Sequence, residues 1–163
     1  MKREWEKWDK PGVAVNIHQY WLKDVSGLEE SHRDVLTELV REYVPRSCKS
    51  VLEVGSGTGL IYERLVPAVI DNSCYTGVDI SSEMMRIART SFPQGNFIQG
   101  DAFALGFKDG AFDTVFAFEV LGHIPEIRVP IAEMIRVAGR LAMFTVWVSP
   151  TGKTVNRGEK FSG

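Results

Sequence analysis

The segment from Val51 to Gly59, VLEVGSGTG, has the residue types and spacing of a ligand-binding turn. An apolar run suited to a buried strand leads into alternating glycines, Gly55, Gly57 and Gly59, with Ser56 between the first two. Glycine tolerates positive φ angles and lets a ligand approach the backbone closely. Such turns often hold a pyrophosphate. Taken alone, the pattern also fits a tight turn between a strand and a helix.

An acidic residue distinguishes this turn from an ordinary phosphate-binding loop. Glu53 lies just before the first glycine, and no Lys or Arg follows until Arg64. At about 4 Å and an effective dielectric constant near 20, two like charges repel by about 4 kcal/mol. A cationic ligand converts this repulsion into attraction. S-adenosylmethionine fits the charge pattern, because it carries a sulfonium and an α-ammonium but no phosphate.

A second acid, Asp79, ends the next apolar segment, twenty residues beyond Gly59. An acid at this position can accept hydrogen bonds from ribose hydroxyls, in nicotinamide dinucleotides and in other adenosyl cofactors. The dinucleotide fingerprint, however, ends in a glycine where this chain has Leu60. Leu60 and Glu53 together make an NAD(P)-dependent oxidoreductase the less favoured alternative.

Strands and helices are expected to alternate from Ser50 onward. Apolar, β-branched segments predict five strands, SVLEVG, CYTGVDI, NFIQGD, FDTVFAFE and GRLAMFTVWV, with helices at 60–70, after Ser81 or Ser82, and at 131–137. This order predicts an α/β fold, a doubly wound and mainly parallel sheet with helices on both faces. Ligands of such sheets bind at the carboxyl ends of the strands. Four acids are expected at that edge: Glu53, Asp79, Asp101 and Glu119.

The chain of 163 residues is expected to form one domain. Residues 1–45 would be a helical cap, 50–148 the cofactor-binding core and 149–163 a polar tail. The N-terminal arm carries Trp5 and Trp8. Two interpretations remain open for it: an arm that packs its indoles on the domain, which we favour, or a lid over a pocket. His18, Tyr20 and Trp21 on the following helix are expected to serve in aromatic packing.

Composition narrows the classes of partner. The net charge of −2 provides no basic footprint for nucleic acid. No apolar run has the length of a membrane span, and the N-terminus has no signal-peptide core, so a cytoplasmic location without stable membrane insertion is expected. Cys48 and Cys74 suggest two free thiols rather than a disulfide, and no metal site is expected.

Residues from about Ser50 to Thr145 resemble class I S-adenosylmethionine-dependent methyltransferases. The similarity is greatest to the small-molecule group that includes quinone-biosynthesis enzymes. The segments VLEVGSGTG, GVDIS, IQGDAFALGF and FDTVFAFEVLGHI follow one another in the order and spacing of that family's motifs. The resemblance implies a Rossmann-like fold and methyl transfer from S-adenosylmethionine to a small-molecule acceptor.

The resemblance also implies roles for individual residues. Glu53 and the glycine loop would hold the methionine moiety, Asp79 the ribose, and Asp101 the adenine amine. The full set of implied cofactor-binding residues is Glu53, Gly55, Ser56, Gly57, Gly59, Asp79, Ile80, Asp101, Ala102 and Glu119. His123 is the candidate general base. It could equally be a residue at the entry to a helix before Pro125.

The sequence departs from the family after the fifth strand. Family members usually add a helix and a hairpin that complete the sheet, and nothing here supplies them. The fifth strand would then be an apolar edge, which invites pairing with another chain. We therefore expect either a fragment of a longer protein or a homodimer through this edge. A non-catalytic S-adenosylmethionine-binding module is the alternative function.

Overall fold

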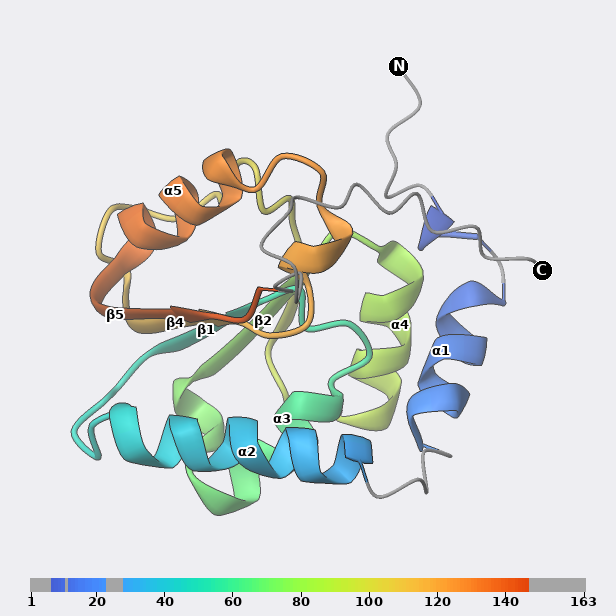
Figure 1. The fold of residues 1–163 in the computed structure, drawn as a ribbon, viewed down its shortest axis with the longest axis horizontal. Coiled ribbons are helices and arrows are strands. Elements are labelled where there is room, and N and C mark those ends of the chain that lie inside the picture. Colours follow the sequence, from blue (N-terminus) through green and yellow to red (C-terminus); the bar gives the residue numbers. More distant parts are fainter. Residues whose placement is uncertain (1–6, 11, 23–27, 147–163) are drawn as a thin grey trace, which may run out of the picture.

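The structure, a computed structural model, describes residues 7–10, 12–22 and 28–146. Its centre is a five-stranded sheet in the order β3-β2-β1-β4-β5, with every neighbouring pair parallel (Figure 1). The strands are β1 (Val51–Val54), β2 (Tyr75–Asp79), β3 (Phe97–Gln99), β4 (Phe112–Ala117) and β5 (Ala138–Phe144). The strand order reverses between β1 and β4. This reversal is the switch point at which doubly wound sheets bind ligands, so the predicted fold class is confirmed.

Helices cover both faces of the sheet. They are α1 (Val13–Leu22), α2 (Leu28–Tyr43), α3 (Leu60–Ala68), α4 (Ser82–Ser91) and α5 (Arg128–Val137), with short 3-10 turns η2 (Asn72–Cys74) and η3 (Leu121–His123). In Figure 1, α2 and α3 lie below the sheet and α5 lies above it.

Two apolar clusters correspond to the two faces of the sheet. Beneath it, Leu36, Val40, Tyr62, Leu65, Met85 and Ala88 of α2, α3 and α4 pack on Val51, Tyr75, Phe97 and Phe116. Above it, Met134 and Val137 of α5 pack on Leu52, Val54, Val78 and Val115. The three central strands β1, β2 and β4 are therefore buried on both sides, which explains why their sequences are nearly continuous apolar runs, whereas the outer strands β3 and β5 are only partly buried.

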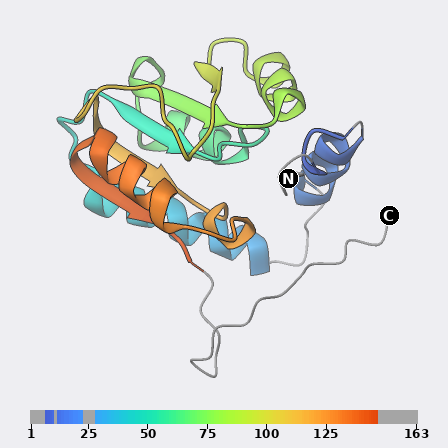
Figure 2. The same cartoon turned by 90° about the horizontal axis from the view of Figure 1, so that it is seen from above.

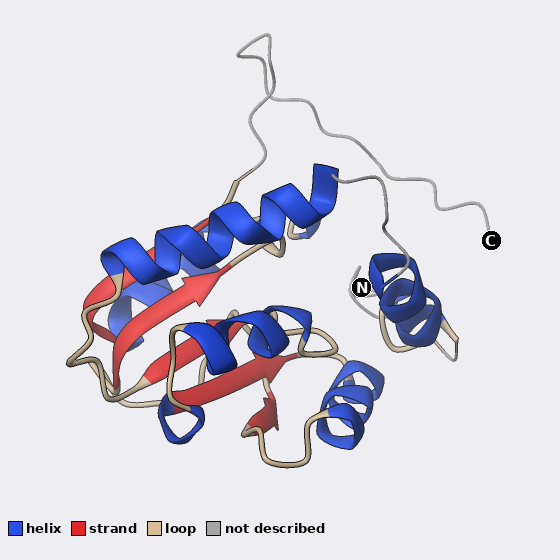
Figure 3. Ribbon diagram, turned by 90° about the horizontal axis from the view of Figure 1, so that it is seen from below, coloured by secondary structure: helices blue, strands red, loops and turns tan. Residues whose placement is uncertain are grey.

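The helix α1 lies beyond the carboxyl ends of the strands, next to α4 (Figures 2 and 3). It precedes the sheet in the chain and begins at Val13. The helix expected after Ser81 or Ser82 is α4, and Ser81 caps it, because its hydroxyl accepts the Met84 N–H. Cys48 and Cys74 are free thiols, as expected.

The sheet ends at β5, which among the described residues pairs only with β4. Pairing of this edge with a second copy therefore stays a prediction. The expected polar tail, residues 149–163, and Trp5 lie outside the described residues. No helix within the described ranges combines the length and apolarity that crossing a membrane requires.

The sheet needs a glycine at position 77 to pack against the loop after β1. A Cβ on Gly77 would lie 2.8 Å from both Phe97 Cδ1 and Ser56 Oγ, closer than real contacts allow. We expect Gly77→Ala to lower the free energy of unfolding by about 1–3 kcal/mol, because the overpacked side chains must move. Urea denaturation measures the change.

Gly106→Ala is the matched control for this substitution. A Cβ there meets nothing within 4 Å and the backbone φ is not positive. The control variant should be as stable as the wild type, or more stable by up to about 1 kcal/mol. Equal stabilities of the two variants would contradict the packing described for Gly77.

Candidate functional site

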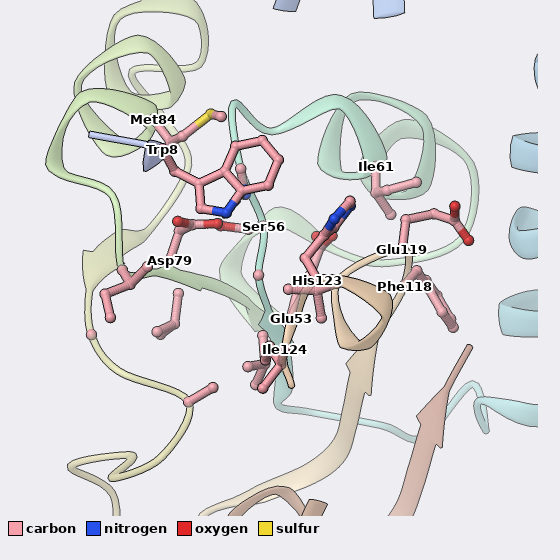
Figure 4. Close-up of a pocket in the computed structure, with 18 of the residues that line it drawn as sticks. Trp8, Glu53, Ser56, Ile61, Asp79, Met84, Phe118, Glu119, His123 and Ile124 are labelled. Atoms are coloured by element: carbon pink, nitrogen blue, oxygen red, sulfur yellow. Dashed lines mark hydrogen bonds between the residues drawn. The ribbon is translucent and has the colours of Figure 1, made fainter. Parts of the chain in front are cut away.

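A pocket of about 250 Å³ opens at the carboxyl ends of β1, β2 and β4 (Figure 4). It brings together most of the residues predicted from the sequence. The predicted residues that line it are Glu53, Gly55, Ser56, Gly57, Asp79, Ile80, Asp101, Ala102, Glu119 and His123. No Lys or Arg lines the pocket in the part of the chain that the structure describes. The electrostatic environment is therefore acidic, as the sequence predicted.

The glycines of the loop after β1 have different surroundings. All three have positive φ, with Gly55 at 79°, Gly57 at 53° and Gly59 at 86°. A Cβ on Gly57 would meet nothing within 4 Å, so the backbone there is open to a ligand. A Cβ on Gly59 would instead strike Phe92 and Phe97. Gly59 is not among the residues that line the pocket, and its lack of a side chain allows the loop to pack closely on Phe92 and Phe97; its expected contact with the cofactor stays a prediction.

Asp79 connects the glycine loop to the start of α4. Its Oδ2 accepts the Gly57 N–H at 2.9 Å and its Oδ1 accepts the Ser81 N–H at 2.9 Å. Burial raises the pKa of this carboxyl group, while backbone N–H groups, first that of Ser81, oppose the rise. Each carboxylate oxygen has a second acceptor position. Asp79 can therefore hold the two turns together and still accept hydrogen bonds from ligand hydroxyls.

Glu53 lies on β1 beneath this loop, with only 1% of its surface exposed. The Tyr75 hydroxyl donates a hydrogen bond to Glu53 Oε2. Burial raises the pKa of Glu53 to about 8; the hydrogen bond from Tyr75 opposes the rise, and the charge of Asp79 adds to it. At neutral pH the ligand-free pocket therefore holds Glu53 mainly protonated. The sequence-based reasoning treated this residue as a fixed negative charge, and burial is the reason for the difference.

Glu119 follows β4 with an unusual backbone. Its φ is 61°, in the left-handed region that a non-glycine residue adopts at a cost of about 1–2 kcal/mol. Its N–H donates to Thr145 Oγ1 at 2.8 Å, and this hydroxyl is 3.3 Å from Glu119 Oε1. Thr145, just after β5, therefore supports the conformation. Sequence reasoning did not identify Thr145, because nothing local marks a partner on another strand.

His123 of η3 and Trp8 of the N-terminal segment form one wall of the pocket. Their ring centroids are 5.1 Å apart and the rings meet edge to face, at 72°. Figure 4 shows both among the lining residues, with Asp79 and Met84 near the indole. The structure thus places Trp8 in the pocket, where the less favoured sequence interpretation, a lid, had put it.

The remaining polar groups also suit an adenosyl ligand. Asp101 lines the pocket, and its Oδ1 accepts the Phe103 N–H at 2.9 Å. Ser56 is 5% exposed and its Oγ has no hydrogen-bond partner among the described residues. A buried hydroxyl without a partner favours a bound ligand group. The pocket offers acceptors for hydroxyl and amine donors, an open backbone at Gly57 and no Lys or Arg among the described lining residues, a combination that fits S-adenosylmethionine.

The protonation of Glu53 yields a test by pH. Glu53 binds its proton more tightly in the folded protein than in the unfolded chain, where its pKa is near 4.5. Unfolding free energy should therefore fall as pH rises from about 4.5 to about 8, by up to about 1.4 kcal/mol per pH unit. Glu53→Gln preserves an acceptor for Tyr75 but does not titrate, so its stability should change less over this window. Parallel stability curves in urea denaturation would contradict the raised pKa.

Comparison with known proteins agrees with this site. Residues 51–139 match the methyltransferase domain family. A demethylmenaquinone methyltransferase from Roseiflexus castenholzii is 32% identical over 69% of this chain and 46% of its own length. A 27-O-demethylrifamycin SV methyltransferase from Amycolatopsis mediterranei is 30% identical over 83% of this chain and 53% of its own length. The chain thus spans about half the length of the curated relatives it matches.

Solved structures show the same fold. The PH0226 protein from Pyrococcus horikoshii superposes with a TM-score of 0.61, is 29% identical, and the match covers 72% of this chain and 58% of that one. The magnesium protoporphyrin IX methyltransferase from Synechocystis, solved with bound cofactor, gives a TM-score of 0.67 at 22% identity over 85% of this chain and 72% of that one. The family match covers the glycine loop and the strand ends that form the pocket. The chain belongs to the class I S-adenosylmethionine-dependent methyltransferase family.

Proposed function

We propose that this chain binds S-adenosylmethionine and transfers its methyl group to a small-molecule acceptor. The observation that carries the proposal is the placement of Asp79 at the switch point, hydrogen-bonded to both turns beside the open backbone of Gly57. The absence of Lys and Arg from the described pocket lining favours a cationic cofactor over a phosphate-containing one. Asp79, Gly57 and most of the residues that line the pocket lie inside the family match.

In this proposal, each wall of the pocket holds one part of the cofactor. Asp79 accepts hydrogen bonds from the ribose hydroxyls, while Ile80 packs on the adenine ring. Asp101 accepts from the adenine amine, and the Ala102 N–H meets the edge of the ring. Glu53, Ser56 and the backbone of Gly55 and Gly57 lie beneath the methionine moiety. A cation there would stabilise the ionised form of Glu53 against the cost of its burial.

The chain's own contribution to the reaction is mainly positioning. When bound, S-adenosylmethionine would supply an activated methyl group, whose carbon a nucleophile attacks while the sulfur leaves as the neutral thioether of S-adenosylhomocysteine. Holding two reactants in line can lower the barrier by roughly 7–11 kcal/mol. The pocket residues Phe118, Ile124 and Pro125 are apolar and exclude water from the acceptor side. His123 would remove a proton only from acceptors that must lose one.

Small molecules are the acceptor class that the comparisons favour. The relatives are named for methyl transfer to a menaquinone precursor and to a rifamycin. The chain's net charge of −2 gives no support for nucleic acid as substrate. We propose a location in the cytoplasm, and a homodimer through β5 as the assembly to test.

A non-methylating function remains the second candidate. The crystal structure of the [4+2]-cyclase SpnF superposes with a TM-score of 0.57 and is 30% identical over 64% of this chain and 40% of that one. This fold therefore carries proteins named for other chemistry. Incubation with methyl-labelled S-adenosylmethionine and a panel of phenols, quinols, carboxylates and amines separates the two candidate functions. Labelled product that can be extracted indicates methyl transfer. Tight cofactor binding without labelled product indicates a binding module.

Cofactor binding depends on Asp79 in this proposal. Asp79→Ala should weaken binding of S-adenosylmethionine by about 1–3 kcal/mol, because charge-assisted hydrogen bonds to the ribose are lost. Isothermal calorimetry measures the change, and Asp79→Asn is a second variant that keeps the size of the side chain. Asp113→Asn is the control, since Asp113 also accepts a backbone N–H, from Lys49, but does not line the pocket. No heat with folded wild-type protein would reject the cofactor assignment.

His123 should affect turnover rather than cofactor affinity. If His123 removes a proton from the acceptor, or orients the acceptor, the variant His123→Ala should transfer methyl groups more slowly to the acceptor found in the panel. The dissociation constant of the cofactor should stay within about twofold of the wild-type value. Turnover equal to wild type would show that His123 has a structural role, which includes its packing against Trp8.

A further inference from the structure

Residues 7–10 are fixed to the start of α4 by the side chain of Asp9. Its Oδ1 lies 3.0 Å from Ser81 Oγ and 3.2 Å from Ser82 Oγ, and accepts the Glu83 N–H at 3.4 Å. Ser81 Oγ also lies 3.1 Å from the carbonyl oxygen of Trp8. Burial of Asp9 tends to raise its pKa, but these hydrogen bonds prevail and lower it. Asp9 is therefore an ionised anchor for the neighbouring Trp8.

A second contact fixes α1 to the glycine loop. His18 Nδ1 and Thr58 Oγ1 share a hydrogen bond of 2.8 Å. Thr58 is buried and lies between Gly57 and Gly59. The helix is therefore attached to the loop that, in the proposed function, contacts the methionine moiety.

The two anchors span the pocket. Ser81 and Thr58 belong to the same two turns that Asp79 joins from below, through Ser81 N–H and Gly57 N–H. Between the anchors, Trp8 and Ile17 line the pocket from the N-terminal segment. The indole of Trp8 also packs edge to face on the ring of His123, which follows β4. The described N-terminal residues thus bridge both walls.

We propose that residues 7–10 and α1 form a cover that must detach at Asp9 and His18 before the cofactor can leave, so these two residues set the rate of cofactor release. The proposal rests on the proposed function, because it concerns the same pocket. Asp9 and His18 are positioning residues: they act through Trp8 and Ile17 and are themselves outside the pocket lining.

The expected consequence is kinetic. A ligand beneath a closed cover escapes only from the open state, so a weaker anchor raises the dissociation rate in proportion to the open population. Loss of a side chain that accepts hydrogen bonds at a helix start shifts such an equilibrium by a few-fold to tenfold or more. The methyl-transfer step itself should be unaffected by the Asp9 substitution, because Asp9 does not contact the reactants in this proposal.

The test measures release of S-adenosylhomocysteine by stopped-flow fluorescence in wild type, Asp9→Ala and His18→Ala. We expect dissociation about three- to tenfold faster in each variant. Asp71→Ala is the matched control: Asp71 accepts from Ser73 N–H and Oγ at 2.8 and 2.6 Å in a similar turn, but lies outside the pocket. Its release rate should equal that of wild type.

A second readout needs no ligand. Amide hydrogen exchange at Glu83 and Met84 should accelerate in ligand-free Asp9→Ala and stay unchanged in Asp71→Ala, since the Asp9 anchor covers the start of α4. If both anchor variants bind S-adenosylhomocysteine but release it at the wild-type rate, the proposed cover is wrong and the proposed function is unaffected. Failure of wild type to bind S-adenosylhomocysteine would reject the proposed function, and the cover with it. Faster release in Asp71→Ala as well would show a general loss of stability and overturn the inference.

Discussion

The hydrogen bonds of one carboxylate, that of Asp79, determine the shape of the pocket. The parallel register of β1 and β2 pairs Val54 with Val78, so Asp79 ends β2 level with the turn after β1. Its two oxygens take one N–H from each turn, Gly57 and Ser81. The open backbone at Gly57 and the helix start at Ser81 are therefore held in a fixed relation. The contacts of the N-terminal segment, from Asp9 to Ser81 and from His18 to Thr58, attach to the same two turns.

The same connection brings acids together in a buried place. Asp79 and Glu53 each raise the electrostatic cost of ionising the pocket, and no Lys or Arg among the described lining residues offsets it. The ligand-free protein reduces the cost by holding Glu53 mainly protonated against Tyr75. A ligand with positive charge would reduce it by attraction. Cationic selectivity thus follows from burial as well as from the number of acids.

The sequence predicted the parts of the site that are local. The glycine loop, Asp79 and the Ser81 cap each lie within one strand-to-helix turn, and spacing along the chain locates them. Spacing could not separate Gly57, which is open to the pocket, from Gly59, which packs on Phe92 and Phe97. It also could not give the protonation state of Glu53, because that depends on burial by the completed core.

Contacts between distant segments were beyond the sequence alone. Thr145 supports Glu119 from the strand beside it, and Asp9 reaches Ser81 across 72 residues. Neither contact has a periodic or compositional signature, since each requires the sheet order to be known. For the same reason the sequence could not show that Trp8 packs on His123 and lines the pocket at the same time.

The pocket therefore has two parts with different origins. Its floor consists of strand ends and tight turns, whose positions follow from the sheet itself, and the family match of residues 51–139 covers this floor. Its walls come partly from Trp8, Ile17 and Leu36, which precede the sheet in the chain, and partly from the residues His123, Ile124 and Pro125 after β4. A floor fixed by backbone hydrogen bonds can serve one cofactor while the walls change with the acceptor. This division is consistent with relatives named for acceptors as different as a menaquinone precursor and a rifamycin.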